Sequence, residues 1–338
     1  MSERIQLAHG GGGTLMQQLI ERELRPLYTD PQLALQDAAR LELEHGRLAF
    51  STDGYVVQPL EFPGGDIGKL AVTGTANDLA MAGARPRHLS VALILEEGLE
   101  LDLLRRVVRS MAAAARACGL TVVAGDTKVV ERGKGDGIFV TTSGLGLLEA
   151  EEAIGPERIA AGDQLLVSGD LGRHGVAVLA ARHQLELQPP LESDCAPLWP
   201  LVEALLAAGV TPHCLRDLTR GGLASALQEL ASASGVDLLL EEERLPVIAP
   251  VARCCELLGL DPLHLANEGR AVVVVAPGDL QRALAVLAPR GGCWVGEAAP
   301  GGRGEEGVPR PARVRLRTPF GSERVLVPLS GELLPRIC

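Results

Sequence analysis

The sequence predicts an α/β (α+β) protein of two α/β domains, with a flexible N-terminal arm and a flexible C-terminal tail. The chain has 338 residues, and a domain usually takes roughly 100–200. From Leu48 to Leu287, apolar runs of strand length alternate with segments of helical periodicity, which is typical of α/β units. Aromatic residues make up only 2% of the chain, so small aliphatic side chains must fill the contacts between helices and sheets.

The first domain is expected over residues 36–152, after an arm formed by residues 1–35. The arm contains four successive glycines, which are too flexible for a regular element. Asp53-Gly54 indicates a turn or bulge between two short strands. The predicted elements are strands at 48–52 and 55–57, a helix at 67–82, a strand at 89–95, a helix at 101–118, and strands at 120–124 and 138–148.

The second domain is expected over residues 153–300, with a linker-like segment at 155–162. Cys254-Cys255 falls on an apolar helix, which indicates packing in the core. Residues 301–338 are predicted to form a Gly- and Pro-rich linker, a hairpin around Phe320-Gly321 and a mobile tail ending in Cys338. The other predicted elements are a strand at 164–168, a helix at 220–234, a strand at 271–276 and a helix at 279–287.

The composition excludes several classes of function. With 32 Lys+Arg against 43 Asp+Glu the formal charge is −11, whereas a general nucleic-acid binder needs a basic face. No apolar run approaches the roughly 18 residues that a membrane span requires. The seven cysteines are odd in number and contain no C-x-x-C, which favours a reducing compartment. We therefore expect a cytoplasmic protein that contacts neither membrane nor nucleic acid.

Familiar nucleotide-binding and hydrolase motifs are missing. Residues 64–69 read GGDIGK, one residue short of the P-loop spacing, and Leu70 stands where that motif has Ser or Thr. No predicted strand is followed by G-x-G-x-x-G, and H-E-x-x-H and G-x-S-x-G are absent. The chain must therefore use a less familiar site.

Four aspartates are candidate ligands of a magnesium–nucleotide complex: Asp37, Asp53, Asp78 and Asp126. The last three are predicted to follow apolar elements and they border small residues, where a backbone can approach a ligand. Mg²⁺ typically takes one or two carboxylates together with phosphate oxygens and water, so several separated acids suit it. Each of them taken alone also fits an ordinary turn or cap.

Glycines and basic residues supply candidates for the phosphate side of such a site. A Gly-rich arm can wrap phosphates with its backbone N–H groups, and the start of a helix attracts anions. Lys128 can neutralise phosphate or position a reacting group, and Glu268 precedes a strand from which it can face the site. The nucleotide-binding candidates are His9, Gly10, Gly11, Gly12 and Gly13 in the arm and Arg220, Gly221 and Gly222 at the predicted helix start.

Cys338 is the sharpest single feature. It is the last residue of the sequence, on a segment with no core to fill. Ten extended residues reach at most roughly 35 Å, so the thiol can visit a distant site or another protein. A thiolate is the nucleophile that carries acyl-type groups. The remaining six cysteines are expected to serve packing.

Several segments together resemble the HypE family of hydrogenase maturation factors. The resemblance covers essentially the whole chain, and the terminal PRIC separates it from the wider aminoimidazole ribonucleotide synthetase/selenophosphate synthetase superfamily. It implies two α/β domains of the aminoimidazole ribonucleotide synthetase type that form a homodimer. The matching segments are IQLAHGGGG, STDGYVVQPLEFPGGDIGKLAVTGTANDLAMAGARP, ILEEG, AGDTKVV, RDLTRGGLA, ANEG and PRIC.

The resemblance also implies a reaction, that of an ATP-dependent carbamoyl dehydratase. The carbamoyltransferase HypF would load a carbamoyl group on Cys338, and ATP would activate its oxygen so that loss of phosphate leaves an S-cyanide. The cyanide would pass to iron on a HypC–HypD scaffold for the nickel–iron hydrogenase centre. The family's Mg²⁺ and ATP acids match Asp53, Asp78 and Asp126, with Asp37 as a further contributor. Lys128 and Glu268 are both candidates for the base.

Two other functions remain open at this point. A selenophosphate-synthetase-like enzyme would want a reactive cysteine in the Gly-rich arm, yet the first cysteine is Cys118. A non-catalytic scaffold could use the Cys338 thiol only to dock partners or metal. Such a scaffold would need neither the acids nor Lys128.

Overall fold

The chain folds into two compact α/β units, which confirms the predicted fold class. The structure, a computed structural model, describes residues 4–6, 9, 18–27, 46–301, 311–327 and 336–338. One unit comprises Met1–Ala80, Ala84–Glu149 and Cys338, and the other comprises Met81–Gly83 and Ala150–Ile337. None of the helices in these described ranges is long and apolar enough to cross a membrane.

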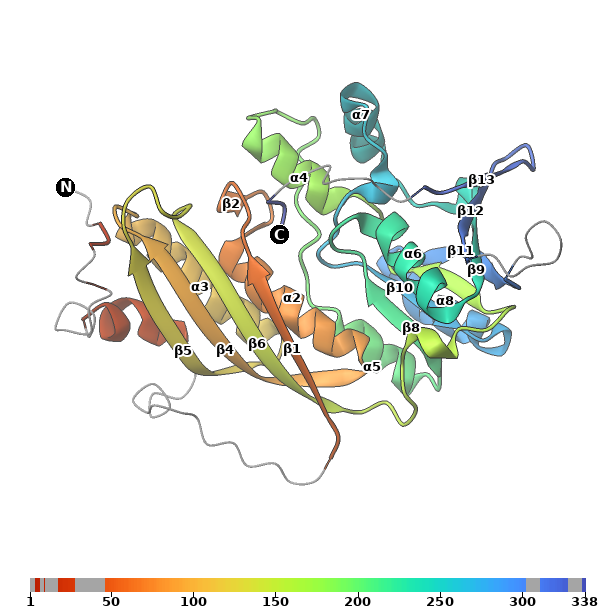
Figure 1. Ribbon diagram of the computed structural model, residues 1–338, viewed down its shortest axis with the longest axis horizontal. Coiled ribbons are helices and arrows are strands. Elements are labelled where there is room, and N and C mark those ends of the chain that lie inside the picture. Colours follow the sequence, from red (N-terminus) through yellow and green to blue (C-terminus); the bar gives the residue numbers. More distant parts are fainter. Residues whose placement is uncertain (1–3, 7–8, 10–17, 28–45, 302–310, 328–335) are drawn as a thin grey trace. The chain divides into compact units, whose positions relative to one another are not determined.

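The first unit is built on a four-stranded sheet in the order β1-β6-β4-β5. β6 is antiparallel to both β1 and β4, and β5 lies parallel to β4. Two helices cover one face of this sheet (Figure 1). The elements are β1 Leu48–Tyr55, β2 Glu61–Phe62, β3 Gly65–Asp66, α2 Ile67–Met81, β4 Ala84–Glu96, α3 Leu101–Ala117, β5 Thr121–Val130 and β6 Ile138–Leu148.

Two predictions for this unit are wrong. Asp53-Gly54 is not a turn, because Asp53 pairs with Thr142 and Gly54 with Thr141 in an unbroken β1–β6 register. The strand predicted to end at residue 124 continues to Val130. In both places pairing with a long neighbouring strand overrides the local preference of Asp and Gly for turns. The acids of interest therefore lie inside elements rather than after them.

The GGDIGK segment starts a helix. The Asp66 side chain accepts hydrogen bonds from the backbone N–H groups of Gly68 (2.7 Å) and Lys69 (3.0 Å). The Lys69 ammonium donates to the carbonyl oxygen of Gly64 at 2.7 Å. Burial raises the pKa of Asp66, although the hydrogen bonds that it accepts act in the opposite direction. Both side chains thus stabilise the start of α2.

The second unit contains a seven-stranded sheet in the order β13-β12-β9-β11-β7-β10-β8. All neighbouring strands are antiparallel except β12 and β9, and β12 and β13 form the predicted hairpin. The elements are β7 Gln164–Val167, α4 Arg173–Arg182, α5 Trp199–Ala207, β8 Pro212–Asp217, α6 Gly222–Ser234, β9 Asp237–Glu241, α7 Ala249–Leu258, β10 Ala271–Val275, α8 Leu280–Leu287, β11 Cys293–Ala299, β12 Val314–Arg317 and β13 Glu323–Val325.

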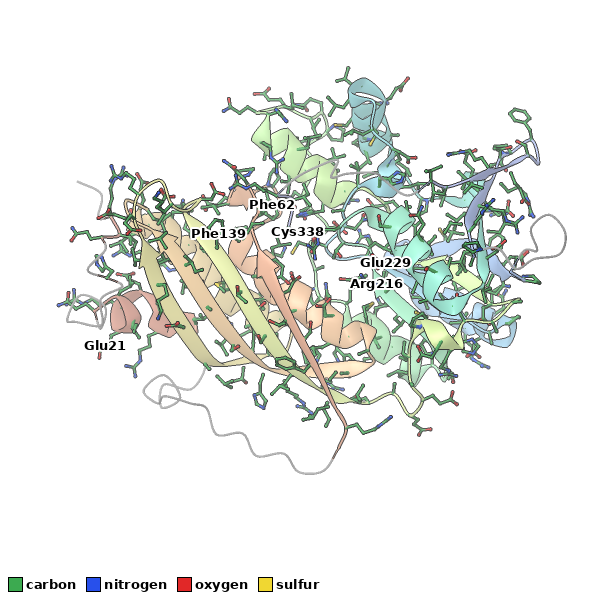
Figure 2. The ribbon with its side chains drawn as sticks, in the orientation of Figure 1. Glu21, Phe62, Phe139, Arg216, Glu229 and Cys338 are labelled. Atoms are coloured by element: carbon green, nitrogen blue, oxygen red, sulfur yellow. The ribbon has the colours of Figure 1, made fainter. Side chains whose placement is uncertain are left out.

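The core of this unit is apolar. Every residue of β10 is buried, and α6 packs Leu223, Leu227 and Leu230 into the same cluster as Val272 and Val274. An ion pair links β8 to α6 at the surface, where Arg216 and Glu229 lie 3.2 Å apart (Figure 2). Because successive side chains of β10 point to opposite faces, the sheet is covered on both faces at this strand.

Candidate functional site

A polar network joins α2 to the sheet of the first unit. The hydroxyls of Thr75 and Thr142 lie 2.6 Å apart, and the Tyr55 hydroxyl lies 3.4 Å from that of Thr75. Ser51 donates to the Asp78 carboxylate at 2.6 Å. A helix–sheet contact is usually apolar, so this interface gives up hydrophobic packing for hydroxyls and an acid.

Asp53 belongs to the same network by its place in β1. Side chains alternate along a strand, so Asp53 shares a face with Ser51 and Tyr55, and both of these contact α2. Asp53 is half-buried, and its carboxylate accepts the backbone N–H of Gly54 at 2.8 Å. The structure therefore brings Asp53 and Asp78 to one helix-facing surface, with carboxylate oxygens of the kind that a hard cation prefers.

Asp126 lies on the opposite face of the same sheet. It pairs with Ala92, which pairs with Thr141, and Thr141 pairs with Gly54. Gly54 and Asp53 are neighbours in β1 and point to opposite faces. Since β1 and β5 are the outer strands of four, about 14 Å also separates them at roughly 4.8 Å per strand. One chain therefore does not bring Asp126 to the surface that Asp53 and Asp78 share.

Asp126 has a cation beside it instead. The Lys128 ammonium lies 2.9 Å from the carboxylate, and this hydrogen bond lowers the pKa of Asp126. Both side chains are more than half exposed, so the pair contributes little to stability. Lys128 and Asp126 point from β5 to the face of the sheet that α2 and α3 leave open.

A metal cluster of three or more His, Cys, Asp or Glu side chains does not occur within the described ranges. Two carboxylates are nevertheless sufficient for Mg²⁺ when phosphate oxygens and water complete its shell. The half-buried Asp53 and the Asp78 carboxylate oriented by Ser51 fit that requirement. Asp37 lies outside the described residues.

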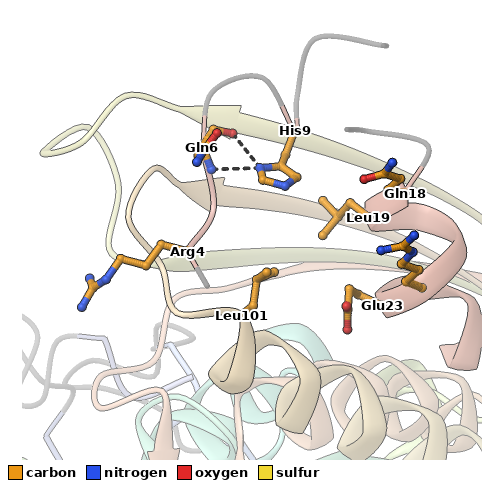
Figure 3. A pocket seen from close by; sticks show the side chains of 8 residues that line it. Arg4, Gln6, His9, Gln18, Leu19, Glu23 and Leu101 are labelled. Atoms are coloured by element: carbon orange, nitrogen blue, oxygen red, sulfur yellow. Dashed lines mark hydrogen bonds between the residues drawn. The ribbon is translucent and has the colours of Figure 1, made fainter. Parts of the chain in front are cut away.

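His9 lines a pocket at the N-terminal end of the first unit (Figure 3). Its Nδ1 atom accepts the backbone N–H of Gln6 at 3.0 Å. Gly10, Gly11, Gly12 and Gly13 follow directly and lie outside the described residues. The pocket is lined by Arg4, Gln6, His9, Gln18, Leu19, Arg22, Glu23 and Leu101.

The candidates at the start of α6 lie in the second unit. Gly221 and Gly222 have φ angles of 72° and 59°, and a Cβ on Gly222 would come within 2.5 Å of the Leu265 carbonyl oxygen. The glycines are thus required by the left-handed backbone and by close packing. Arg220 beside them is exposed.

Glu268 also lies in the second unit and is only 2% exposed. The Asp194 carboxylate accepts the backbone N–H groups of Glu268 and Gly269 at 3.2 and 3.1 Å. The preceding Asn267 accepts from Gly172 at 2.7 Å and donates to the Leu218 and Leu265 carbonyl oxygens. The loop that carries Glu268 is therefore held rigidly.

Cys338 differs from most of the other thiols. Five cysteines are buried, whereas Cys293 and Cys338 are partly exposed. Burial raises the pKa of both Cys118 and Cys214 to about 12. In the first unit the backbone N–H of Val56, directly after β1, donates to the Cys338 oxygen at 3.3 Å.

Sequence reasoning missed the hydroxyl network around the acids. The sequence feature that indicates this network is the run VTGTAND within α2. Thr73, Thr75 and Asn77 of this run are at most 2% exposed. Polar residues at every second position of an otherwise apolar helix are unusual for a buried surface. A Cβ on Gly74 would come within 2.2 Å of the Tyr55 hydroxyl, so this glycine allows the close approach.

Comparison with known proteins identifies the family. The N-terminal domain model of the AIR synthase related proteins matches residues 35–148, and the C-terminal domain model matches residues 160–308. The carbamoyl dehydratase HypE of Rhodobacter capsulatus is 51% identical over 345 residues, covering 99% of this chain and 98% of that protein. The chain belongs to the HypE family of carbamoyl dehydratases. The predicted family and enzyme class are thereby confirmed.

Other HypE proteins agree with this assignment. HypE of Escherichia coli is 49% identical over 345 residues, with 99% of each chain covered. A crystal structure of HypE in complex with ATP has a TM-score of 0.92 and 45% identity, and covers 98% of this chain and 99% of that one. HypE in a crystallised HypE–HypF complex has a TM-score of 0.78 and 41% identity, and covers 93% and 99%.

Proposed function

We propose that this protein converts an S-carbamoyl group on Cys338 into an S-cyanide at the expense of ATP, supplying cyanide ligands for nickel–iron hydrogenase maturation. The observation that carries the proposal is the hydrogen bond from Val56 to Cys338. Val56 follows the strand that holds Asp53. The terminal residue and a candidate acid for the ATP-dependent step thus meet in one unit of a HypE-family chain.

The reaction needs both ATP and a base. A carboxamide oxygen is a poor leaving group, and transfer of the γ-phosphoryl group to it creates a phosphate ester that leaves readily. Cleavage of the C–O bond releases inorganic phosphate, while the two nitrogen protons are removed and the C≡N bond forms. The thiocarbamate and ATP thus become thiocyanate, ADP, phosphate and a proton. Lys128 and Glu268 are the candidate bases.

Asp53 and Asp78 are the residues that we expect to hold Mg²⁺, with Asp37 as a further contributor, whereas Asp126 would contribute from a second copy of the chain. Bound there, the ion would neutralise charge on the transferred phosphoryl group. Ser51 keeps the Asp78 carboxylate oriented. In the nucleotide site we include His9, the glycines that follow it at 10–13, and Arg220 with Gly221 and Gly222.

The open face of the first sheet supports a homodimer. Phe50 is 67% exposed and Leu48 is 43% exposed on that face, and Ile94 is 39% exposed on the same side. Large apolar side chains exposed on an open sheet face are typical of an interface. We infer that a second copy of the chain covers it, and that Asp126 and Lys128 then lie at the interface.

The expected protein partners are those of the pathway. HypF would supply the carbamoyl group, as a HypE protein has been crystallised with HypF, and a HypC–HypD complex would accept the cyanide. The carrier must stay a free thiol, and all seven cysteines are free. We therefore place the reaction in the reducing cytoplasm.

Intact-mass analysis tests the proposal directly. Incubation with a carbamoyl donor system and Mg-ATP should add a carbamoyl mass to the C-terminal peptide and then remove the mass of one water. Cys338→Ala should abolish the adduct while ATP binding survives. A wild-type C-terminal peptide that carries no adduct would exclude this function, and loss of ATP binding in the variant would mean that the tail is structural.

The alternatives are less well supported. A selenophosphate-synthetase-like reaction would need an N-terminal nucleophile, and Cys118, the first cysteine, is buried with its pKa raised to about 12. A purely docking scaffold gives no reason for a carboxylate between helix and sheet. ATP turnover that depends on selenide would favour the selenophosphate-synthetase-like reaction. An adduct on Cys338 that never loses water would favour the scaffold.

A further inference from the structure

The two residues before Cys338 are held by one helix of the second unit. His174 on α4 contacts the Ile337 carbonyl oxygen through Nε2 at 2.9 Å. Arg182, eight residues further along the same helix, donates to the Arg336 carbonyl oxygen at 2.8 Å. The Ile337 side chain is only 5% exposed. Two hydrogen bonds thus fix this short segment to α4.

The hydrogen-bond partners of His174 determine its tautomer. A carbonyl oxygen only accepts, so Nε2 must carry the proton that is donated to Ile337. In the neutral ring Nδ1 is then an acceptor, and Ser193 Oγ lies 2.8 Å from it. Ser193 in turn accepts the backbone N–H of Cys195 at 3.1 Å, which leaves its hydroxyl hydrogen for Nδ1. The donors thus run in one order, from the Cys195 N–H to Ser193, from Ser193 to His174, and from His174 to the Ile337 carbonyl oxygen.

These contacts also restrict the position of Cys338. The peptide unit is planar, so the Ile337 carbonyl lies in one rigid plane with the amide nitrogen and Cα of Cys338. A donor that fixes this oxygen therefore fixes the point from which the Cys338 side chain begins. Arg336 has a φ of 57°, a conformation that a residue with a side chain keeps only when surrounding contacts hold it.

We propose that His174 and Arg182 form a latch that docks the tail and positions the Cys338 thiol for the ATP-dependent step. The two are positioning residues, because each binds a tail carbonyl and neither is assigned a contact with the reacting group. The role rests on the proposed dehydration, since the latch serves a thiol that is loaded elsewhere. Without the latch the tail should load normally and dehydrate slowly.

The first test measures the accessibility of Cys338 without ATP or carbamoyl donor. The probe is iodoacetamide, and the rate is read from the C-terminal peptide by mass spectrometry. His174→Ala removes the donor and should raise the alkylation rate several-fold to about tenfold, the effect of losing one buried hydrogen bond. His174→Gln places an amide N–H where Nε2–H was and should restore the wild-type rate.

Matched controls separate the latch from a general loosening of α4. His183 is exposed directly after the same helix, so His183→Ala should alkylate like wild type. Arg182→Ala provides a second way to open the latch if His174→Ala does not fold. Equal rates in wild type, His174→Ala and Arg182→Ala would overturn the proposal, and so would a His174→Ala effect that His174→Gln fails to rescue.

The second test follows a single turnover of dehydration on protein that has already been carbamoylated. His174→Ala should lower the rate constant about tenfold, with an unchanged KM for ATP and an unchanged extent of loading. Loss of loading or of ATP affinity in this variant would contradict a positioning role. If wild-type protein accepts no carbamoyl group, the proposed function fails, while the alkylation test still decides whether the latch exists.

Discussion

The two units pack a helix on a sheet in opposite ways. In the first unit α2 meets β1 and β6 through hydroxyls and a carboxylate, among them Thr75, Thr142 and Asp78. In the second unit α6 meets its sheet through leucines and valines such as Leu227 and Val274. The apolar interface provides stability, and the polar one keeps acids inside the fold where a ligand can use them. The two largest of four expected effects test this division directly, and the smaller two test the open face of the first sheet and the buried His174 of the second unit.

Asp78→Asn should slow dehydration by about 10²–10³-fold, because the neutral amide no longer offers a charged ligand for Mg²⁺. The fold should survive, since an amide oxygen can still accept from Ser51. Single-turnover mass spectrometry of carbamoylated protein measures the rate. Glu229→Gln on α6 is the matched control and should leave it unchanged. Normal dehydration by Asp78→Asn would remove Asp78 from the metal site.

Leu227→Ala should destabilise the protein by about 3 kcal/mol, because it removes a fully buried side chain and leaves a cavity. Thr142→Val on the polar side should cost about 1 kcal/mol, the contribution of a buried hydrogen bond. Urea unfolding of both variants gives the comparison. A larger loss for Thr142→Val would mean that the polar interface stabilises the fold more than the apolar one.

Phe50→Asp should weaken self-association at least tenfold, because it places an unpaired charge on the open face of the first sheet. Phe320, which is 96% exposed in the second unit, provides the control variant Phe320→Asp. Sedimentation equilibrium compares the dimer dissociation constants. A Phe50→Asp protein that dimerises like wild type would show that this face is not the interface.

His174→Gln should flatten part of the pH dependence of stability. Burial lowers the pKa of His174, while the Ile337 hydrogen bond and the charge of Asp194 raise it less strongly. Below about pH 6.5 the unfolded chain binds a proton that the folded chain does not. The free energy of unfolding therefore decreases as the pH is lowered, by at most about 1.4 kcal/mol per pH unit. This decrease continues on acidification until the pH reaches the pKa of His174 in the folded state. Denaturant titrations between pH 5 and 7 should show a shallower slope in the variant, and equal slopes would refute this account.

The sequence was informative where local pattern and tertiary packing agree. The helix over α2, the strand β6 and the β12–β13 hairpin follow from periodicity and turn residues, and the fold class follows from their alternation. It failed at Asp53-Gly54, where pairing with β6 keeps extended a dipeptide that is typical of turns. Strand propensity is weak compared with a continuous ladder of hydrogen bonds.

The candidate site could be predicted only in its residue types. Asp53, Asp78 and Asp126 were selected together, but no pattern says that β5 carries Asp126 to the other face of the sheet. That depends on strand order, which is set by tertiary contacts. The pairing of His174 with Ile337 is equally hidden, because 163 positions separate the two residues.

Both hydrogen bonds of the latch end on backbone carbonyl oxygens, those of Arg336 and Ile337. The peptide groups are the same whether Cys338 carries a free thiol, a carbamoyl group or a cyanide. The latch therefore contributes equally to docking for every load and does not by itself distinguish substrate from product. In the proposed reaction, the order of events would then be set by ATP consumption and by the affinities of the proteins that load and unload the tail, and the latch would set only how long the tail stays docked.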